Sequence, residues 1–282
     1  AAMDFPFGGG KTVLAIPRPL AQEERRGLLL RFGALLNSLG GRYGTGADLG
    51  TTTEDMQTIA EVSEYVIGVH GRTDGPMDPS PYTALGVLEG IRSAVRHKFE
   101  STDLRGRRIL VQGVGSVGAG LATDLAAEGA HLLISDIDEA RARALAECLS
   151  GEFVPTGEVY STPCDVYAPC AIGATLGPDT IHLLQCAIVA GAANNQLQRP
   201  ADADALHERG ILYAPDYVIN GGGAMAFTSI YQGVDDLDEI DRRVRAIGTS
   251  LGGIFAEAAM AARSPVVSAQ ALADRVLARG PK

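Results

Sequence analysis

The sequence has no excess of basic residues and no long apolar run, and each absence excludes a class of protein. Its 24 lysines and arginines stand against 34 aspartates and glutamates, and the resulting net charge of -10 disfavours nucleic acid or an anionic membrane as a partner. No stretch reaches the ~18 uninterrupted apolar residues of a membrane-spanning helix. We expect a cytoplasmic protein that acts on a small molecule.

Cysteine is also scarce. The four cysteines form no CxxC pair and have no histidine at the spacing of a metal site; they are Cys148, Cys164, Cys170 and Cys186. Free cysteine mostly behaves as a small buried hydrophobe. We therefore expect reduced thiols in the core and no bound metal, with a zinc site or a disulfide as the alternative.

A chain of 282 residues, 46% of them hydrophobic, is long enough for two lobes with separate cores. In the first lobe, a short β-branched run ended by a proline predicts a strand over residues 11–17. Apolar residues at helical spacing predict helices over residues 21–39 and 51–66. Residues 71–80 are rich in glycine, proline and aspartate and predict the loop between the lobes, before a helix over residues 81–97.

Strands and helices then alternate through the middle of the chain. Residues 107–136 read as an apolar strand, a glycine loop, an alanine-rich helix and a second strand, which is one βαβ unit. Further strands over residues 164–167, 187–190 and 211–214 predict a doubly wound parallel sheet. The C-terminal segment is predicted to be helical, with one apolar stripe made of Leu237, Ile240, Val244, Ile247, Leu251 and Ile254.

The glycine loop of this unit has the spacing of a dinucleotide-binding motif, and its place between a strand and a helix strengthens the match. Backbone N–H groups and the positive helix end would face the pyrophosphate there, so we expect it to lie over the loop Gly113, Val114, Gly115, Ser116, Val117 and Gly118. Asp136 ends the next strand, where its carboxylate would accept hydrogen bonds from ribose hydroxyls and repel a 2′-phosphate. NAD is therefore the expected cofactor. Arg141 and Arg143 leave NADP as an alternative, and a ligand-free strand–turn–helix with a surface aspartate is another.

Two further loops of small residues carry a single charge each. Lys11 follows Gly9 and Gly10, and Asp48 follows Gly46 after one alanine. The missing side chains would let a substrate approach closely. Taken alone, either charge is a solvated surface group. A functional role is indicated when they are considered together with Asn194 and Asn220, each of which lies in a segment that contains glycine.

These motifs, in this order, resemble the Glu/Leu/Phe/Val amino-acid dehydrogenase superfamily, and most closely its leucine, valine and phenylalanine dehydrogenases. The resemblance implies reversible, NAD-linked oxidative deamination of an L-amino acid by a homo-oligomer. It implies that Lys11 serves the substrate and the attacking water, with Gly9 and Gly10 beside it, and that Asp48 exchanges a proton with the amino nitrogen. Thr83 and Asn220 then match residues that hold the nicotinamide or the substrate, while Ala193 and Asn194 match cofactor contacts.

The family's side-chain pocket corresponds to Gly46, Ala224 and Phe227, none of which is charged. Burying the distal carboxylate of glutamate unpaired would be costly, so an apolar or aromatic amino acid is the expected substrate. The match departs at the beginning, because relatives carry a longer preceding segment with a second lysine that holds the substrate carboxylate. We expect this chain to be a fragment whose substrate lobe is incomplete at its N-terminal end. Gly221 is a smaller departure, since relatives often have alanine there.

The expected fold is α/β, with a smaller α/β substrate lobe at residues 1–78 and a Rossmann NAD domain at residues 79–232. Helices at residues 233–282 are expected to pack back towards the first lobe. Two other functions stay open. One is an NAD-binding sensor or scaffold without catalysis. The other is a dehydrogenase of another substrate class, such as a hydroxy acid, which would call for a histidine acid/base that the matched loops lack. The preferred amino acid, the subunit count and the physiological direction do not follow from the sequence.

Overall fold

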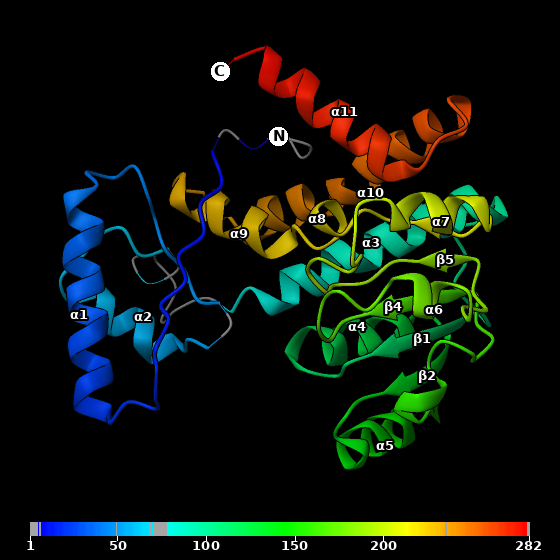
Figure 1. Ribbon diagram of the computed structural model, residues 1–282, viewed down its shortest axis with the longest axis horizontal. Helices are drawn as coiled ribbons and strands as arrows, with labels where there is room; N and C mark the ends of the chain where they lie inside the picture. Colours follow the sequence, from blue (N-terminus) through cyan, green and yellow to red (C-terminus); the bar gives the residue numbers. More distant parts are fainter. Residues whose placement is uncertain are drawn as a thin grey trace. The chain divides into compact units, whose positions relative to one another are not determined.

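The structure is a computed structural model that describes residues 5, 7–48, 50–67, 69, 78–234 and 236–280 (Figure 1). The chain divides into two compact units. The larger unit contains Ser80–Met225 and Asp241–Lys282, and the smaller unit contains Phe7–Pro79 and Ala226–Ile240. The domain limits expected from the sequence, at residues 78 and 232, stay a prediction. Most of the predicted inter-lobe loop, residues 71–77, lies outside the described residues.

The larger unit is built on a six-stranded parallel sheet with the strand order β3-β2-β1-β4-β5-β6. The strands are β1 (Arg108–Gln112), β2 (His131–Ser135), β3 (Glu152–Phe153), β4 (Val166–Pro169), β5 (Ile188–Val189) and β6 (Leu212–Tyr213). In β1, Ile109, Leu110 and Val111 are fully buried, as expected for a parallel strand covered on both faces. The doubly wound parallel sheet is confirmed. Strand β3 was not predicted, because Glu152–Phe153 lacks the buried apolar run that marks the other strands.

Helices connect the strands. They are α3 (Ser80–Phe99), α4 (Ser116–Ala127), α5 (Glu139–Cys148), the 3-10 helix η1 (Thr156–Glu158), α6 (Pro178–Ile181), α7 (Asp202–Glu208), α8 (Asp216–Ile219) and α9 (Gly222–Tyr231). The helices predicted before and after the glycine loop are thus confirmed as α3 and α4. Among the described residues, no helix is long and apolar enough to cross a membrane.

The C-terminal helices α10 (Leu237–Met260) and α11 (Pro265–Ala278) are confirmed as well. The apolar stripe of α10 is buried within the chain, since Ile240, Ile247 and Leu251 are 0% exposed. A Cβ at Gly86 of α3 would lie 2.8 Å from the Cδ1 atom of Ile247, so the missing side chain lets α10 pack closely on α3. The stripe residues from Val244 to Ile254 lie in the larger unit, whereas Leu237 and Ile240 belong to the smaller unit.

In the smaller unit, α1 (Gln22–Ser38) and α2 (Thr53–Ala60) pack side by side around a core that includes Phe32, Leu36 and Ile59 (blue in Figure 1). The helix predicted over residues 51–66 was wrong in length, because it ends at Ala60. The following residues form a parallel bridge instead. Thr45 donates its N–H to the carbonyl of Tyr65 at 2.9 Å, and Ile67 donates to the carbonyl of Thr45 at 2.7 Å.

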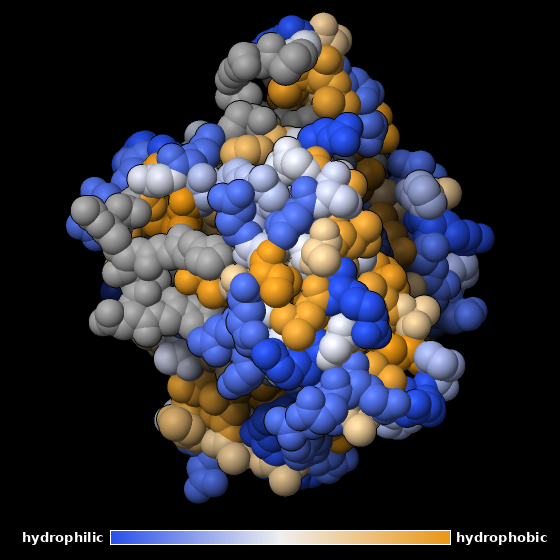
Figure 2. All heavy atoms as spheres, turned by 90° about the vertical axis from the view of Figure 1, so that its left-hand side faces the viewer, coloured by the Kyte–Doolittle hydropathy of each residue, from blue (hydrophilic) through white to orange (hydrophobic). Residues whose placement is uncertain are grey.

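The strand predicted over residues 11–17 is not formed in the structure, so that prediction was wrong. In the described part of the chain these residues have no ladder partner, and three apolar side chains stay exposed, namely Val13 (79%), Leu14 (41%) and Ile16 (45%). A β-branched run favours extended backbone, but a strand also needs a neighbour to pair with. Figure 2 shows the face seen from the α1 side of Figure 1, where hydrophobic residues gather in patches among hydrophilic ones.

The cysteines follow the prediction only in part. All four are free thiols, but Cys148 is exposed and not in the core. Burial raises the pKa of Cys164 to about 12 and that of Cys170 to about 11, so both thiols stay protonated. In the described part of the chain, no group of histidine, cysteine and carboxylate side chains could hold a metal ion.

Candidate active site

The glycine loop joins β1 to α4, and its three glycines meet three different surroundings. Gly113 has a φ of +93°, a left-handed conformation that other residues rarely adopt. A Cβ at Gly118 would lie 1.9 Å from the carbonyl oxygen of Gly113, so glycine is needed for the helix to start this close to the strand. A Cβ at Gly115 would have nothing within 4 Å. The loop is therefore tightly packed on its protein side and open at Gly115.

The open side of the loop coincides with the start of α4. Gly115 is the N-cap residue, and no side chain caps the helix. The first-turn N–H groups, including those of Ser116 and Val117, therefore remain available at the positive end of the helix dipole. A pyrophosphate fits this surface, because it needs N–H donors and close approach to the backbone. These residues are the ones in the described chain that would hold a dinucleotide.

Asp136 lies directly beyond β2, and its carboxylate is 6% exposed. The backbone N–H of Val114 donates to Oδ2 at 2.7 Å, which ties the aspartate to the glycine loop. Oδ1 accepts from the N–H of Asp138 at 2.9 Å and from Nη2 of Arg141 at 2.8 Å. Burial alone would raise the pKa of Asp136, but these hydrogen bonds outweigh it and lower the pKa. A carboxylate has about four acceptor positions, so Oδ2 keeps one for a ribose hydroxyl.

The two arginines considered for a 2′-phosphate have separate partners. Arg141 is held by Asp136, and its pKa is raised by that bond. The guanidinium of Arg143 lies over the ring of Phe153, 3.7 Å from the ring centroid, and Nη2 contacts Glu139 at 3.3 Å. Only Arg141 therefore lies at the predicted ribose position.

The residues expected at the other end of the cofactor also lie near one another. Asn220 donates Nδ2 to Oδ1 of Asn194 at 2.7 Å and to the carbonyl of Ala192 at 3.2 Å. Ala193, between them in the loop, is buried. A Cβ at Gly222 would lie 2.0 Å from the carbonyl of Tyr82 and 3.2 Å from the Cα atom of Thr83, so the loop after Asn220 packs against the start of α3. Thr83, Asn194 and Asn220 are thus gathered in one part of the larger unit.

Two exposed isoleucines extend this site, and the sequence analysis missed them. Ile137 follows Asp136 and is 92% exposed, and Ile172 lies in the loop after β4 and is 76% exposed. Both residues follow the carboxyl end of a strand of the parallel sheet, the edge at which ligands bind in such folds, so they are candidates for contact with an apolar part of the cofactor. An adenine ring has that chemistry. The signal in the sequence was the apolar residue directly after the aspartate.

In the smaller unit, Lys11 and Asp48 form an ion pair between their Nζ and Oδ2 atoms. The two residues are 37 positions apart, so tertiary structure alone brings them together. Lys11 is 66% exposed and Asp48 is 53% exposed, which leaves both charged ends accessible to a substrate. The pair therefore places an ammonium group, which donates hydrogen bonds, directly beside a carboxylate, which accepts them.

The backbone of Asp48 is fixed by a turn whose anchor the sequence analysis missed. The hydroxyl of Thr51 accepts from the N–H of Asp48 at 2.8 Å and donates to the carbonyl of Asp48 at 2.7 Å. Nη2 of Arg25, on α1, donates to the carbonyl of Gly50 at 2.8 Å. The Asp48 loop is therefore attached both to its own turn and to the helical core of the unit.

Two aromatic rings fill the space that glycines leave near the ion pair. A Cβ at Gly10 would lie 2.8 Å from Cε2 of Tyr43, and a Cβ at Gly46 would lie 3.1 Å from Cε2 of Phe227. The ring of Phe227 thus occupies the space beside Gly46. The contact gives Phe227 a fixed place beside the loop of Asp48. Ala224, one turn earlier in α9, is exposed.

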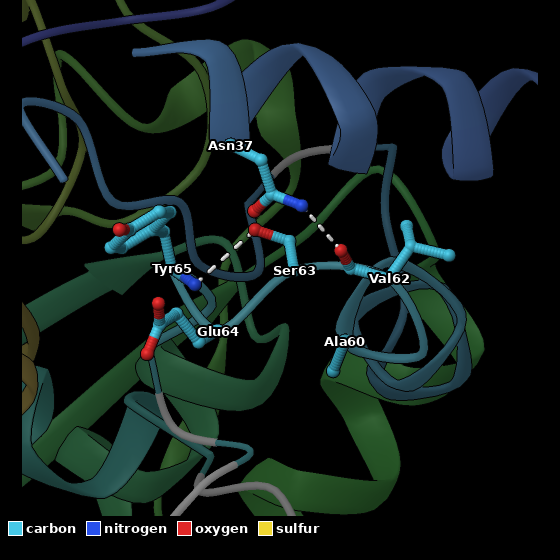
Figure 3. Close-up of a pocket in the computed structure, with 6 residues that line it drawn as sticks. All are labelled: Asn37, Ala60, Val62, Ser63, Glu64 and Tyr65. Atoms are coloured by element: carbon cyan, nitrogen blue, oxygen red, sulfur yellow. Dashed lines mark hydrogen bonds between the residues drawn. The ribbon is translucent and has the colours of Figure 1, made fainter. Parts of the chain in front are cut away.

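The smaller unit has a cavity of about 390 Å³, but none of the predicted site residues lines it (Figure 3). It lies between Asn37 at the end of α1 and residues 60–65. Nδ2 of Asn37 donates to the carbonyl of Val62 at 2.6 Å, and the N–H of Tyr65 donates to Oγ of Ser63 at 3.3 Å. These bonds hold the segment that bridges to Thr45, three residues before Asp48.

The predicted site residues therefore form two groups. The smaller unit holds Lys11, Asp48, Gly46 and Phe227, and the larger unit holds the glycine loop, Asp136, Thr83, Asn194, Asn220 and Ala224. The contacts described above join Lys11 with Asp48 and Gly46 with Phe227, Asp136 with the glycine loop, and Asn194 with Asn220. Their assignment to a cofactor and a substrate stays a prediction.

Comparisons with known proteins point to one group of enzymes. The sequence model of the Glutamate/Leucine/Phenylalanine/Valine dehydrogenase family matches residues 133–269. The leucine dehydrogenase of Bacillus subtilis (strain 168) is 43% identical over 226 residues, which are 80% of this chain and 61% of that protein. The chain thus spans 61% of the length of that relative. The valine dehydrogenase of Streptomyces coelicolor is 36% identical over 282 residues, 99% of this chain and 76% of that protein.

The fold is similar to that of a solved relative. The crystal structure of the L-tryptophan dehydrogenase from Nostoc punctiforme matches with a TM-score of 0.83 and 35% sequence identity. The match covers 97% of this chain and 78% of that chain. The similarity therefore extends over both units of the chain.

Proposed function

Because the chain belongs to the Glutamate/Leucine/Phenylalanine/Valine dehydrogenase family, we propose that it is an NAD-dependent L-amino-acid dehydrogenase. The reaction is the reversible oxidative deamination of an amino acid with an apolar or aromatic side chain, giving the 2-oxo acid and ammonia. We also expect a homo-oligomer. The observation that carries the proposal is the contact between Lys11 and Asp48.

The ion pair supplies the acid–base chemistry that this reaction needs. Hydride leaves Cα only when the amino nitrogen has lost a proton and can donate its lone pair, so a base must lie beside it. Asp48 is that base, and the bonds from Thr51 hold its backbone in place. Lys11 donates hydrogen bonds to the substrate and to the water that attacks the imine. Both roles require accessible charged ends, which these two exposed side chains have.

In the larger unit the residues bind and orient the cofactor. NAD, when bound, accepts the hydride from Cα. The N–H groups at the start of α4 hold the pyrophosphate, and Asp136 holds the adenosine ribose. Asn194 and Asn220 hold the nicotinamide half, supported by the hydrogen bond between their side chains. The buried negative charge of Asp136 favours NAD over NADP, because a 2′-phosphate would be repelled there.

The substrate side chain is proposed to contact Phe227, whose ring lies against Gly46. An apolar wall without a charged partner selects against glutamate, because its distal carboxylate would be buried unpaired. The leucine, valine and tryptophan dehydrogenases named among the relatives act on apolar or aromatic amino acids by their names, which is consistent with this choice.

The proposal is tested by NADH formation with a panel of L-amino acids at alkaline pH, for the protein and for Lys11→Ala and Asp48→Asn. We expect turnover of leucine, valine or an aromatic amino acid, and a loss of about 100-fold or more in kcat in each variant, as for removal of a general acid–base group. Undiminished turnover in both variants would refute the assignment, and faster turnover of glutamate would refute the substrate class. NADH binding without turnover of any amino acid would favour the sensor or scaffold.

A further inference from the structure

The loop that follows β5, residues 191–196, is held by hydrogen bonds to the end of β4 and to α8, in addition to bonds within the loop. It starts at Gly191, where a Cβ would lie 2.3 Å from the carbonyl oxygen of Pro169 at the end of β4. The N–H of Ala193 donates to that same carbonyl at 2.9 Å. The loop is therefore pressed against the carboxyl end of β4. Two side chains hold the rest of the loop, and neither has been assigned a function above.

The first of these side chains is Gln196, which is 0% exposed. Its Nε2 group donates to the carbonyl of Gly191 at 2.9 Å and to the carbonyl of Ala193 at 3.0 Å. Both N–H donors of the amide are thus used on carbonyls of the same loop. A buried amide of this kind closes the loop on itself and fixes the Gly191–Ala192 and Ala193–Asn194 peptide planes.

The second side chain is Asp216, the first residue of α8. Its Oδ2 accepts the N–H of Asn195 at 2.5 Å, and its Oδ1 accepts the hydroxyl of Tyr213 at 3.2 Å. Burial raises the pKa of Tyr213, and the nearby charge of Asp216 raises it further, so the hydroxyl stays protonated as a donor. Asn195 has a φ of +50°, a left-handed conformation that asparagine adopts more readily than most non-glycine residues. The charged acceptor at its N–H stabilises this conformation.

Asn194 lies between these two anchors. Its Oδ1 accepts from Asn220, and its neighbours Ala193 and Asn195 are bonded to Gln196 and Asp216 respectively. The position of the Asn194 side chain is therefore set by the backbone on both sides and not by its own rotamer alone.

We propose that Gln196 and Asp216 are positioning residues that hold the loop of residues 191–196 in the conformation that presents Ala193 and Asn194 to the nicotinamide half of the cofactor. The inference rests on the proposed function. In a doubly wound sheet the two halves of a dinucleotide lie on opposite sides of the switch point, here between β1 and β4. Asp136 follows β2 on one side, and the loop of residues 191–196 follows β5 on the other. A defect in this loop should therefore affect the nicotinamide half and spare the adenosine half.

The experiment compares the binding of NADH with that of ADP-ribose, which lacks the nicotinamide, in Asp216→Ala, Gln196→Met and the unchanged protein. We expect NADH to bind about 10-fold more weakly in each variant, with the dissociation constant of ADP-ribose changed less than about 2-fold. The kcat for the amino acid should fall further than NADH affinity, about 100-fold, because a small displacement of the reacting carbon is costly in rate. Asp216→Asn, which keeps one acceptor for the N–H of Asn195, should restore most of the affinity.

The outcomes separate this inference from the proposed function. If the unchanged protein binds neither NADH nor ADP-ribose, the cofactor assignment fails. If it binds both and the variants weaken both equally, or weaken neither, the two residues are not positioning residues for the nicotinamide half. Thermal unfolding of each variant, measured in parallel, identifies a loss of binding that comes from unfolding, and Asp216→Asn then provides the decisive comparison.

Discussion

Asp136 carries the cofactor prediction at the scale of one residue. Its carboxylate is buried, bonded to the glycine loop through Val114 and paired with Arg141. The sequence indicated an acid at the end of a strand, but not that the same carboxylate also holds an arginine in place. The carboxylate would repel a 2′-phosphate and the guanidinium would attract it. The balance between these two effects decides whether NAD or NADP binds better.

Replacing this acid should change the cofactor preference. Asp136→Ser removes the negative charge that repels a 2′-phosphate, and it frees Arg141 to form an ion pair with that phosphate. We expect the ratio of kcat/KM for NAD over NADP to fall by about 100-fold, as for the exchange of one or two charge-assisted hydrogen bonds. Arg143→Ala is the matched control, because Arg143 contacts Phe153 and Glu139 instead, and it should leave the ratio unchanged. An unchanged ratio in Asp136→Ser would remove Asp136 from the ribose site.

Thr51 gives a second prediction at this scale. Its hydroxyl makes two hydrogen bonds with the backbone of Asp48. Thr51→Val keeps the shape and removes both bonds, so we expect kcat to fall about 10-fold, the equivalent of one net hydrogen bond. Thr51→Ser keeps the hydroxyl and should retain nearly full activity. Equal activity of the valine and serine variants would show that the turn does not position Asp48.

At the scale of elements, α1 and α2 are joined by the pair of Arg25 and Asp55. Nε and Nη2 of Arg25 donate to the two carboxylate oxygens at 2.8 and 2.5 Å. Asp55 is 6% exposed. The bonds from Arg25 outweigh the effect of burial and lower the pKa of Asp55 below its ordinary value of 3.8. The same arginine holds Gly50 beside the Asp48 loop, so this contact links helix packing to the site.

Because the pKa of Asp55 is lowered in the folded state, its stabilisation is present above the ordinary pKa and is lost as pH falls through the folded pKa. Asp55→Asn should lower the free energy of unfolding by about 2 kcal/mol at neutral pH, and the difference should narrow below about pH 4. Urea unfolding across this pH range measures it. Glu61→Gln removes an exposed pair with Arg26 and should cost less than about 0.5 kcal/mol. If the difference in free energy of unfolding between Asp55→Asn and the unchanged protein does not vary with pH, the charge of Asp55 is not what stabilises the fold.

At the scale of the whole molecule, the packing of α10 on α3 connects the C-terminal helices to the sheet unit. Ile247 is fully buried on this face, whereas Leu237, at the start of the same stripe, is 52% exposed. The periodic pattern does not distinguish the two, because both positions are apolar at helical spacing. Their surroundings in the fold make the difference.

Because of this difference in burial, the same kind of substitution is predicted to lower the free energy of unfolding by different amounts at the two positions. Ile247→Ala should lower the free energy of unfolding by about 2–5 kcal/mol, because it removes buried methyl groups and leaves a cavity. Leu237→Ala should change it by no more than about 0.5 kcal/mol. Denaturant unfolding with a common slope checks both values. Equal costs in the two variants would mean that α10 does not pack in the chain as described.

Local patterns determined most of the larger unit. The apolar strands, the glycine loop before α4 and the helix α3 follow from periodicity and from the steric freedom of glycine, which act within a few residues. These were sufficient to predict the parallel sheet and the place of Asp136 beside the loop. The family resemblance supplied Lys11, Asp48, Asn194 and Asn220 as a set, but no pattern indicated which of them touch.

Tertiary structure decided the rest, because it depends on partners distant in the sequence. The run over residues 11–17 forms no strand, because no strand of the described chain pairs with it, and α2 ends at Ala60, before the segment that bridges to Thr45 through Val66. The ion pair of Lys11 with Asp48 and the anchoring of Asn195 by Asp216 are likewise contacts between separate segments. Sequence alone determined which chemical groups are present and the local conformation of most elements of the larger unit. Only the folded chain decided which groups meet, because that requires the closure of long loops between them.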